Sequence, residues 1–271
     1  ERKRGNTRLF SEALSGELGR ALQCREQVLL LLNRRGTATM VQCRRCGHVV
    51  DCPRCSVALA HHGTRGRLVC HRCGYSMPLP GRCPTCHADR LRFLGVGTQG
   101  VVDELREAFP GARVLRWDSD VPARVRGGTQ LNDAVRAGEV DVIVGTQMIA
   151  KGLDFPGVTL VGVVNADVGL NVPDFRASER VFQLLCQAAG RAGRGVRPGR
   201  VVVQTYEPDH YVLRNAALHD YRGFYSEEMR YRAEGGYPPF TSFVQLVYSH
   251  SDEDQCRREA ERVATVLAAR L

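Results

Sequence analysis

This 271-residue sequence has few lysines and no long apolar segments. No apolar run approaches the roughly 20 residues that a transmembrane helix needs, so we expect a soluble protein. The first residues, Glu1, Arg2, Lys3 and Arg4, are charged rather than apolar, which argues against a secretory signal and an oxidising compartment. The sequence also lacks an initiator methionine and begins in the middle of a pattern, so we expect it to be a fragment.

Cysteine is abundant by contrast, and eight of the eleven cysteines form four Cys-x-x-Cys pairs between residues 43 and 86. Two thiols at this spacing can reach one metal ion, so four pairs are enough for two tetrahedral four-thiolate zinc sites. Glycine follows Cys46 and Cys73, which suits a knuckle whose backbone turns tightly and points N–H groups at sulfur. The sequence therefore predicts two bound zinc ions.

Loop lengths indicate which pairs share an ion. Five residues separate Cys46 from Cys52, which is short for two knuckles to face each other, whereas fourteen separate Cys55 from Cys70. The longer separation approaches the usual zinc-ribbon spacing. The prediction is a nested pair of sites: an inner one of Cys52, Cys55, Cys70 and Cys73, and an outer one of Cys43, Cys46, Cys83 and Cys86.

Disulfides and iron–sulfur ligation are the alternatives for these thiols, and the first of them needs an oxidising compartment. Histidines are also candidate ligands, since five of the eight lie in or beside the same window. With eight thiols already paired, we expect these five to be surface or phosphate-contacting residues: His48, His61, His62, His71 and His87.

The formal net charge of +9 favours an anionic partner. Eight thiolates and two zinc ions would lower that charge by about four. The evidence for an anionic partner is therefore weaker than the formal charge suggests. Lys3 and Lys151 are the only lysines, so 36 of the 38 basic residues are arginines. A GC-rich genome explains this bias, and its physical consequence is many forked donors suited to phosphate.

Outside the cysteine window, apolar strand-like segments alternate with segments of helical periodicity. A helix is predicted over 11–23 with Ser11 as its cap. The remaining prediction is strands at 27–33, 91–96, 112–117, 140–145, 158–165 and 200–206, and helices at 101–109, 126–137 and 178–190. Such alternation predicts an α/β fold with a parallel sheet covered on both faces, and the cysteine window is then an insertion after its first strand.

The pattern changes beyond Glu207, to a helical stretch rich in tyrosine and arginine, a Gly-Gly-Tyr-Pro-Pro break, a strand over 240–250 and a charged final helix. We interpret this as the start of a partial α+β domain, cut at Leu271. The predicted domains are two parts of the α/β lobe (1–40 and 90–206), the inserted double-zinc domain (41–89) and the start of a C-terminal domain (207–271).

One segment matches a dinucleotide fingerprint. GVGTQG at 95–100 fits Gly-x-Gly-x-x-Gly, follows a predicted strand, opens a helix, and is followed by Asp118 at the end of the next strand. The motif falls in the second strand–helix unit, after the metal insertion, so we favour an ordinary glycine-rich turn over a dinucleotide site.

Two other segments are more informative about ligands. VGTQMIAKGLDFPGV (144–158) places Gly145, Thr146 and Gln147 at the carboxyl end of a strand, where open α/β sheets bind ligands, and Lys151, Gly152 and Asp154 follow on the loop. QAAGRAGRG (187–195) spaces Gln187, Arg191 and Arg194 at i, i+4 and i+7, which predicts one shared helical face. Two guanidinium groups at a glycine-rich helix end are typical of arginine fingers, which stabilise negative charge on a transferring phosphoryl group. The alternative is that these arginines belong to an ordinary solvated helix face.

These segments together with LLLLNRRG (29–36) and the double knuckle CRRCGHVVDCPRC…CHRCGYSMPLPGRCPTC resemble the bacterial replication-restart helicases, the PriA or primosomal protein N′ family. The resemblance covers essentially the whole chain. It implies a RecA-like second lobe of a superfamily 2, ATP-dependent 3′→5′ DNA helicase, with an inserted two-zinc ribbon-like domain and a C-terminal domain following. It also implies a bacterial cytoplasmic protein associated with the nucleoid.

The resemblance assigns roles to the residues that match its motifs. Gly145, Thr146 and Gln147 resemble the motif that contacts the DNA backbone, with Lys151 beside it coupling nucleotide state to DNA. Asp154, with Gly152, is similar to the residue near the nucleotide ribose, and Gln187, Arg191 and Arg194 resemble the motif that faces the ATP phosphates. The implied partners are branched or single-stranded DNA at replication forks, single-strand-binding protein, and primosome and helicase-loading proteins.

The sequence departs from that family in one respect. It contains no Gly-x-x-x-x-Gly-Lys-Ser/Thr phosphate loop and no Asp-Glu-x-His box, and phosphoryl transfer needs both a phosphate cradle and a Mg²⁺ ligand. We therefore expect ATP and Mg²⁺ to be used only together with a first lobe outside this sequence. The alternative is a parent protein with a degenerate ATPase that acts as a non-catalytic, fork-binding zinc scaffold and recruits primosome proteins.

Overall fold

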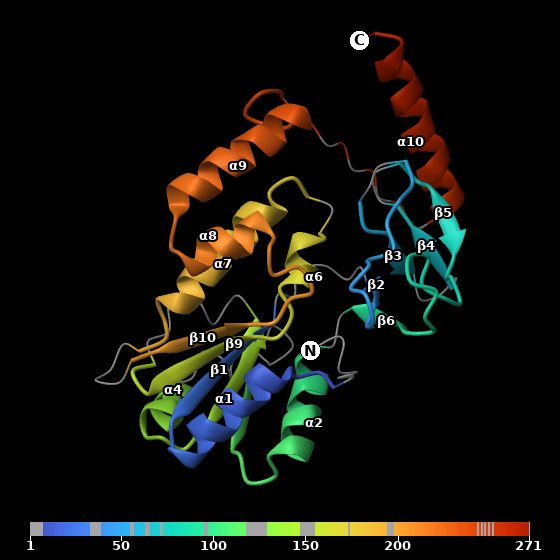
Figure 1. Ribbon diagram of the computed structural model, residues 1–271. Helices are drawn as coiled ribbons and strands as arrows, with labels where there is room; N and C mark the ends of the chain where they lie inside the picture. The colour runs from blue at the N-terminus through green and yellow to red at the C-terminus, as the bar shows by residue number, and fades with distance from the viewer. Residues whose placement is uncertain are drawn as a thin grey trace. The chain divides into compact units, whose positions relative to one another are not determined.

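The fold is that of a computed structural model, shown in Figure 1. The structure describes residues 8–32, 39–54, 57–62, 66–70, 73–94, 97–117, 129–146, 155–172, 174–193, 198–242, 244, 246, 248, 250 and 252–270. Its helices are α1 (Glu12–Gln23), α2 (Thr98–Ala108), α4 (Thr129–Arg136), α6 (Asp167–Leu170), α7 (Ala177–Ala189), α8 (Tyr211–Ala217), α9 (Tyr221–Glu234) and α10 (Glu253–Ala268). Its strands are β1 (Gln27–Leu32), β2 (Thr39–Cys43), β3 (Ala60–His62), β4 (Arg67–Val69), β5 (Ser76–Pro78), β6 (Leu91–Leu94), β7 (Val114–Trp117), β8 (Val142–Thr146), β9 (Val158–Val163) and β10 (Arg200–Val203).

A parallel sheet with strand order β10-β9-β1-β8-β7 forms the centre of the first part of the chain. The central strand β1 is buried on both faces, because Leu29 and Leu31 join one apolar cluster while Val28 and Leu30 join the other. Helices α1 and α2 supply side chains to the second cluster, and α4, α7 and α8 supply them to the first. This layered arrangement confirms the predicted parallel sheet covered by helices on both faces.

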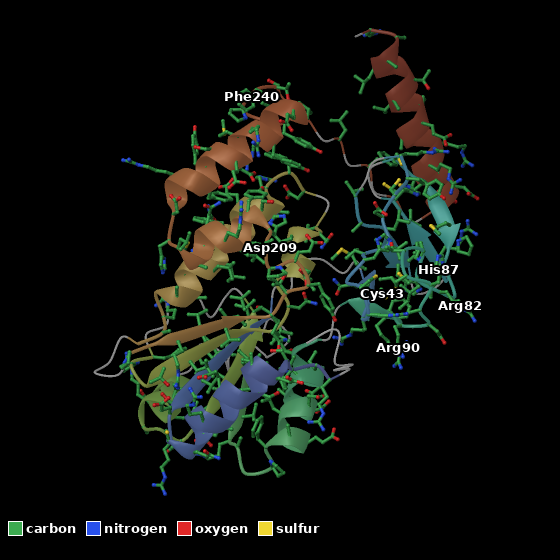
Figure 2. The ribbon with its side chains drawn as sticks, viewed as in Figure 1. Cys43, Arg82, His87, Arg90, Asp209 and Phe240 are labelled. Carbon is green, nitrogen blue, oxygen red and sulfur yellow. The ribbon has the colours of Figure 1, made fainter. Side chains whose placement is uncertain are left out.

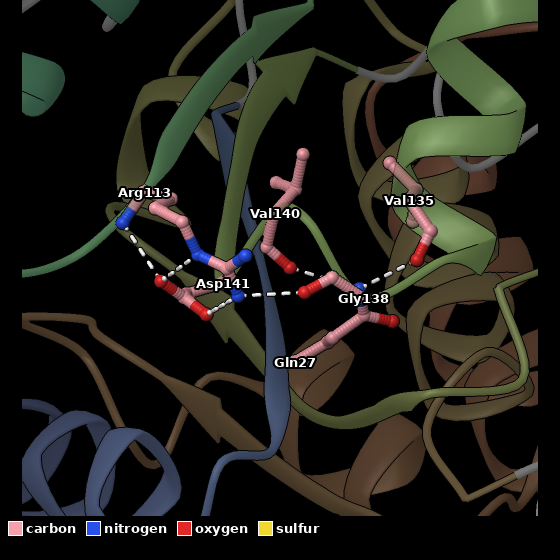
Figure 3. A network of polar contacts seen from close by, with 6 residues as sticks. All are labelled: Gln27, Arg113, Val135, Gly138, Val140 and Asp141. Carbon is pink, nitrogen blue, oxygen red and sulfur yellow. Dashed lines mark hydrogen bonds and ion pairs between the residues drawn. The ribbon is translucent and has the colours of Figure 1, made fainter.

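Apart from the strand at 91–96, the helix and strand predictions for this sheet are confirmed where the structure describes them, with small shifts at the element ends. Helix α1 begins after Ser11, whose side-chain oxygen accepts a hydrogen bond from the Leu14 N–H at 3.1 Å, as the predicted cap requires. The amino ends of β1 and β8 are held by polar contacts that the sequence did not predict (Figure 3). Gln27 Nε2 donates to the carbonyls of Val135 at 2.7 Å and Val140 at 2.8 Å.

A second, antiparallel sheet with order β5-β4-β3-β2-β6 carries the cysteine pairs. It leaves the first sheet at the carboxyl end of β1 and has its own buried cluster: Val41, Val50, Cys52, Leu59, Leu68 and Cys70. The cysteine-rich segment is therefore inserted after the first strand, as predicted.

One strand belongs to a different sheet from the one predicted. Residues 91–94 pair antiparallel with β2, from Met40 opposite Leu94 to Cys43 opposite Leu91, and do not join the parallel sheet. This also removes the context of the dinucleotide fingerprint, because that motif needs a strand of a parallel βαβ unit before its helix. Asp118 lies outside the described residues.

The chain divides into two compact units, Glu1–Glu228 and Met229–Leu271. In the second unit the charged final helix is present as α10, capped by Asp252. The strand predicted over 240–250 is not observed, since the described residues of that range are in irregular conformation with Val244 and Leu246 exposed. The predicted domain boundaries stay a prediction. Among the described residues, no helix combines the length and apolarity needed to span a bilayer.

Candidate functional site

The cysteine pairs sit in tight turns that share one backbone design. In each of three pairs the N–H four residues after the first cysteine donates to that cysteine's carbonyl: Gly47 to Cys43 at 2.8 Å, Gly74 to Cys70 at 2.9 Å and His87 to Cys83 at 2.9 Å. The residue that makes this bond has a positive φ in all three turns, 81° at Gly47, 72° at Gly74 and 56° at His87. The two glycines thus sit where the predicted knuckle needs a left-handed residue, and His87 adopts the same conformation with a side chain.

The structure brings together the four thiols of the predicted outer site. Cys43 Sγ lies 3.6 Å from Cys86 Sγ, Cys46 Sγ lies 3.6 Å from Cys83 Sγ, and all four sulfurs are within 4.8 Å of one another. A tetrahedral zinc site with zinc–sulfur bonds of about 2.3 Å has sulfur–sulfur edges of roughly 3.8 Å. The outer cluster therefore fits a zinc ion without rearrangement.

Three thiols of the predicted inner site also converge. Cys52, Cys70 and Cys73 lie within 4.8 Å of one another, with Cys52 and Cys73 sulfurs 3.6 Å apart. Cys55 lies outside the described residues. The ten described cysteines all have free thiols, which agrees with metal ligation rather than the disulfide alternative.

Electrostatics in the outer cluster favour replacing protons with a cation. Burial raises the pKa of Cys46 to about 12, so that thiol keeps its proton when no cation is near. Burial also opposes ionisation of Cys83, but the backbone N–H groups of Cys86 and Thr85 and the neighbouring thiols lower the pKa of Cys83 to about 7. The Cys83 thiol therefore loses its proton readily, whereas the Cys46 thiol does not. A bound zinc ion would stabilise the thiolate form of all four cysteines.

The histidines of the window do not join these clusters among the residues that the structure describes. His48 and His87 are on the outer turns: the His48 carbonyl accepts from the Cys43 N–H at 2.8 Å, and His87 is exposed. Figure 2 labels His87, Arg82 and Arg90 in the same cysteine-rich domain as Cys43, and all three of these side chains are exposed. His61 is paired with an aromatic ring, whereas His71 and the side chain of His62 lie outside the described residues.

Those candidate helicase residues that the structure describes lie near two opposite ends of the parallel sheet. Gly145 and Thr146 end β8 and pair with Leu31 and Leu32 at the carboxyl end of β1. Arg191 lies on the turn after α7, and two residues later the Gly193 N–H donates to the carbonyl of Val158, the first residue of β9, at 3.1 Å. Along the sheet, Thr146 and Val158 are separated by about six strand residues. At about 3.3 Å per residue, this puts the backbone at Thr146 roughly 20 Å from the backbone at Val158, to which the turn after Arg191 is bonded.

The helix predicted to carry Gln187, Arg191 and Arg194 on one face ends before Arg191, so the described part of that face is not continuous helix. Gln187 is exposed on the last turn of α7, but the helix ends at Ala189, so Arg191 follows on a turn. Gly193 has a φ of +73°, and a Cβ there would stand 2.2 Å from the Gly199 nitrogen. The chain therefore has to leave the helix to pass Gly199. Arg194, Gln147, Lys151, Gly152 and Asp154 lie outside the described residues.

Sequence reasoning missed a buried carboxylate at the carboxyl end of the sheet. Asp167 begins α6 and is 2% exposed, and its two oxygens accept from the Thr205 hydroxyl at 2.8 Å and from the Tyr206 N–H at 2.9 Å. These bonds tie the segment after β9 to the segment after β10. A single aspartate between Ala166 and Val168 gave no signal of this role.

A second missed carboxylate, Asp174, orients the start of α7. It accepts from the backbone N–H of Arg176 at 2.9 Å and pairs with Arg180 Nη1 at 2.7 Å. Burial alone would raise its pKa, but these hydrogen bonds and the two guanidinium charges hold the pKa of Asp174 below its ordinary value. These contacts anchor the first turn of α7, the helix that ends just before Arg191.

Comparison with known proteins matches both parts of this arrangement. Residues 52–78 match the PriA DNA helicase Cys-rich region domain, and residues 95–196 match the helicase conserved C-terminal domain. The replication restart protein PriA of Bacillus subtilis is 45% identical over 269 residues, 99% of this chain and 33% of that protein. The chain belongs to the PriA family.

Other PriA proteins align over the same extent. The PriA of Synechocystis is 42% identical over 98% of this chain and 32% of its own length, and that of Chlamydia pneumoniae is 40% identical over 100% and 37%. The chain thus spans about a third of the length of these relatives. Membership of the PriA family, with its Cys-rich region, agrees with two zinc ions held by the two thiol clusters.

Proposed function

We propose that this chain is the second, DNA-engaging lobe of an ATP-dependent 3′→5′ DNA helicase that acts in replication restart. The proposal is supported by the positions of Thr146 and Arg191, described members of the two candidate sets, near opposite ends of one buried parallel sheet. Thr146 stands at the carboxyl end, and Arg191 stands on a turn bonded to the amino end of β9. A sheet packed on both faces transmits a displacement from one end to the other with little internal deformation.

In this proposal Gly145, Thr146 and Gln147 contact the DNA backbone with Lys151 beside them, while Asp154 and Gly152 lie by the nucleotide. Gln187, Arg191 and Arg194 face the ATP phosphates that a first lobe supplies. The arginines stabilise negative charge that develops on the transferring phosphoryl group, which is the role of an arginine finger. The two zinc ions keep the inserted module folded and take no part in phosphoryl transfer.

The partners in this proposal follow from the same lobe assignment. DNA at branched forks is the substrate, and single-strand-binding protein and helicase-loading proteins of the primosome are the protein partners, in the bacterial cytoplasm at the nucleoid. The net charge of +9 supports an anionic partner.

The experiment is a DNA-stimulated ATPase assay of the full-length protein carrying Arg191→Ala. Removal of an arginine finger lowers turnover by about 10³-fold or more, with DNA binding retained. Arg136→Ala, on the exposed surface of α4, is the matched control and should keep its activity. Unchanged ATPase activity of Arg191→Ala would sink the proposed role of this turn.

A further inference from the structure

One polar side chain is enclosed within the zinc module, beside the outer metal cluster. Gln42 of β2 directly precedes Cys43 and is 2% exposed. Its Nε2 donates to the carbonyl of Gly47 at 3.0 Å, within the turn that carries Cys43 and Cys46. Glutamine is mostly an exposed residue, because its amide needs hydrogen-bond partners when it is buried. The cost of burying this side chain is therefore offset by its bond to the turn.

The Gly47 carbonyl needs an internal donor because the residue is buried. Gly47 is buried, whereas its counterparts Gly74 and His87 in the two other described turns are exposed. Water can hydrogen-bond an exposed carbonyl, but a buried carbonyl has to be paired within the protein. The residues that precede the first cysteine of those two turns are Val69, which has no side-chain donor, and the exposed Arg82. Among the described turns, the glutamine thus stands at the one whose buried carbonyl requires it.

The other end of the amide shows that its donor is the useful group. Within the described part of the chain, Gln42 Oε1 is buried and accepts no hydrogen bond. An unpaired buried acceptor costs free energy, and an apolar side chain of similar size would not carry that cost. The advantage of glutamine at this position therefore comes from the bond that its Nε2 makes to Gly47.

This bond completes the closure of a turn that holds two zinc ligands. The Gly47 N–H donates to the Cys43 carbonyl at 2.8 Å, and Gln42 binds the Gly47 carbonyl. Both polar backbone groups of Gly47 are thus held. Cys46 shares a peptide group with Gly47, and its sulfur lies 3.6 Å from that of Cys83. The glutamine therefore helps to hold Cys46 facing its partner across the cluster.

We propose that Gln42 is a positioning residue for the outer zinc ion, which it does not coordinate itself. It fixes the turn so that the thiols of the outer cluster already stand at tetrahedral spacing, and this raises the zinc affinity of the outer site alone. Residues that orient metal ligands in this way typically change metal affinity by about 10- to 100-fold. The role is independent of ATP hydrolysis and of DNA binding.

The test follows the reactivity of each cysteine in the zinc-loaded chain carrying Gln42→Met. Methionine fills a similar volume but has no N–H, so the Gly47 carbonyl loses its donor. The protein is exposed to a zinc chelator and an alkylating agent, and peptide mass spectrometry gives the alkylation rate of each thiol. We expect alkylation of the four outer cysteines to be about 10- to 100-fold faster than in wild type, with the rates at the inner cysteines unchanged.

Two controls separate the outer site from the rest of the chain. Cys24, an exposed cysteine in neither described cluster, is the internal reference for the reactivity of the reagent. Gln183→Met makes the same substitution at an exposed glutamine of α7 and should leave every rate at its wild-type value. Unchanged rates at the outer cysteines of Gln42→Met would overturn the positioning role. Equal acceleration at both clusters would also overturn it, since Gln42 would then support the fold of the whole module rather than one zinc site.

Discussion

At the scale of single residues, backbone conformation separates the three described knuckle turns. Gly47 and Gly74 adopt their positive φ without cost, whereas His87 holds φ at 56° with a Cβ. A non-glycine residue in the left-handed region costs about 1–2 kcal/mol, and the bond from its N–H to the Cys83 carbonyl keeps it there. Among the described turns, the outer zinc site therefore contains a strained residue at His87, whereas the described turn of the inner site has glycine at the same position.

We expect His87→Gly to stabilise the zinc-loaded chain by about 0.5–1 kcal/mol, because strain relief exceeds the extra entropy of glycine in the unfolded chain. Denaturant unfolding at fixed zinc concentration measures this change. Gly74→Ala is the matched reverse test: a Cβ there meets nothing within 4 Å, so only backbone strain is added. Destabilisation by His87→Gly would mean that the imidazole itself supports the turn.

A second residue-scale prediction concerns the ion pair in Figure 3. Arg113 Nη2 lies 2.6 Å from Asp141 Oδ1, and the Arg113 backbone N–H also donates to Asp141 at 2.8 Å. These hydrogen bonds lower the pKa of Asp141 in the folded protein. The stability they contribute is therefore present above the unfolded-state pKa of about 3.9 and is lost as pH falls through the lower folded-state pKa.

We expect Asp141→Asn to be less stable than wild type near neutral pH, with the difference shrinking below about pH 4. Urea unfolding across this pH range measures the difference. Arg113→Met tests the cause, because its stability loss should overlap with that of Asp141→Asn in a double-mutant cycle. A difference between wild type and Asp141→Asn that does not change with pH would contradict the assignment.

At the scale of elements, the two thiol clusters are built on different strand connections. The outer cluster joins the turn after β2 to the turn before β6, and the inner cluster joins the turns on either side of β3 and β4. Each cluster joins two turns that are distant in the sequence. Each bound ion therefore stabilises the closure of a different loop of the chain.

We expect Cys52→Ser to release about one zinc ion per chain and Cys83→Ser to release the other, with one ion retained in each variant. Metal analysis after gel filtration gives the stoichiometry. Cys186→Ser, on α7 and away from both clusters, is the control and should keep two ions. Loss of all zinc in both single variants would show that the two sites form one cooperative unit.

Elements of the parallel sheet were predictable where burial alone determines them. The apolar run Gln27–Leu32 is buried on both faces, so composition and length were enough to predict a central strand. The run at 91–94 has similar composition, but nothing in its residues states that its partner is β2 rather than β1. Strands of three residues such as β3 and β4 are too short to show any periodicity.

The candidate site was predictable to the same uneven degree. Paired cysteines have fixed spacing, and loop lengths predicted which thiols the structure brings together. The arrangement around Arg191 depends on the close approach of Gly193 to Gly199, a contact that sequence periodicity cannot reveal. Asp167 binds Thr205 and Tyr206, which lie almost forty residues away, so its role cannot be inferred from neighbouring residues in the sequence.

At the scale of the whole molecule, the buried apolar residues are unequally distributed between the two compact units. All members of the four buried clusters precede Met229, and the last of them is Phe224, stacked on Phe182 with centroids 4.1 Å apart. The second unit carries exposed apolar side chains instead, including Val244, Leu246 and Val266. Burial of apolar surface is the main source of folding stability, so the first unit should hold most of it.

We therefore expect a chain ended after Gly236, which retains all of α9, to unfold with the same midpoint and cooperativity as the full sequence. Keeping α9 matters because Tyr211 donates to Glu228 at 2.6 Å and Asn215 donates to Glu227 at 3.1 Å. A chain ended at His219 is the matched comparison, and loss of Phe224 from the core should lower its midpoint by several degrees. A lower unfolding midpoint for the chain ended after Gly236 would contradict this expectation. It would mean that residues 237–271 contribute stability that no described buried cluster explains.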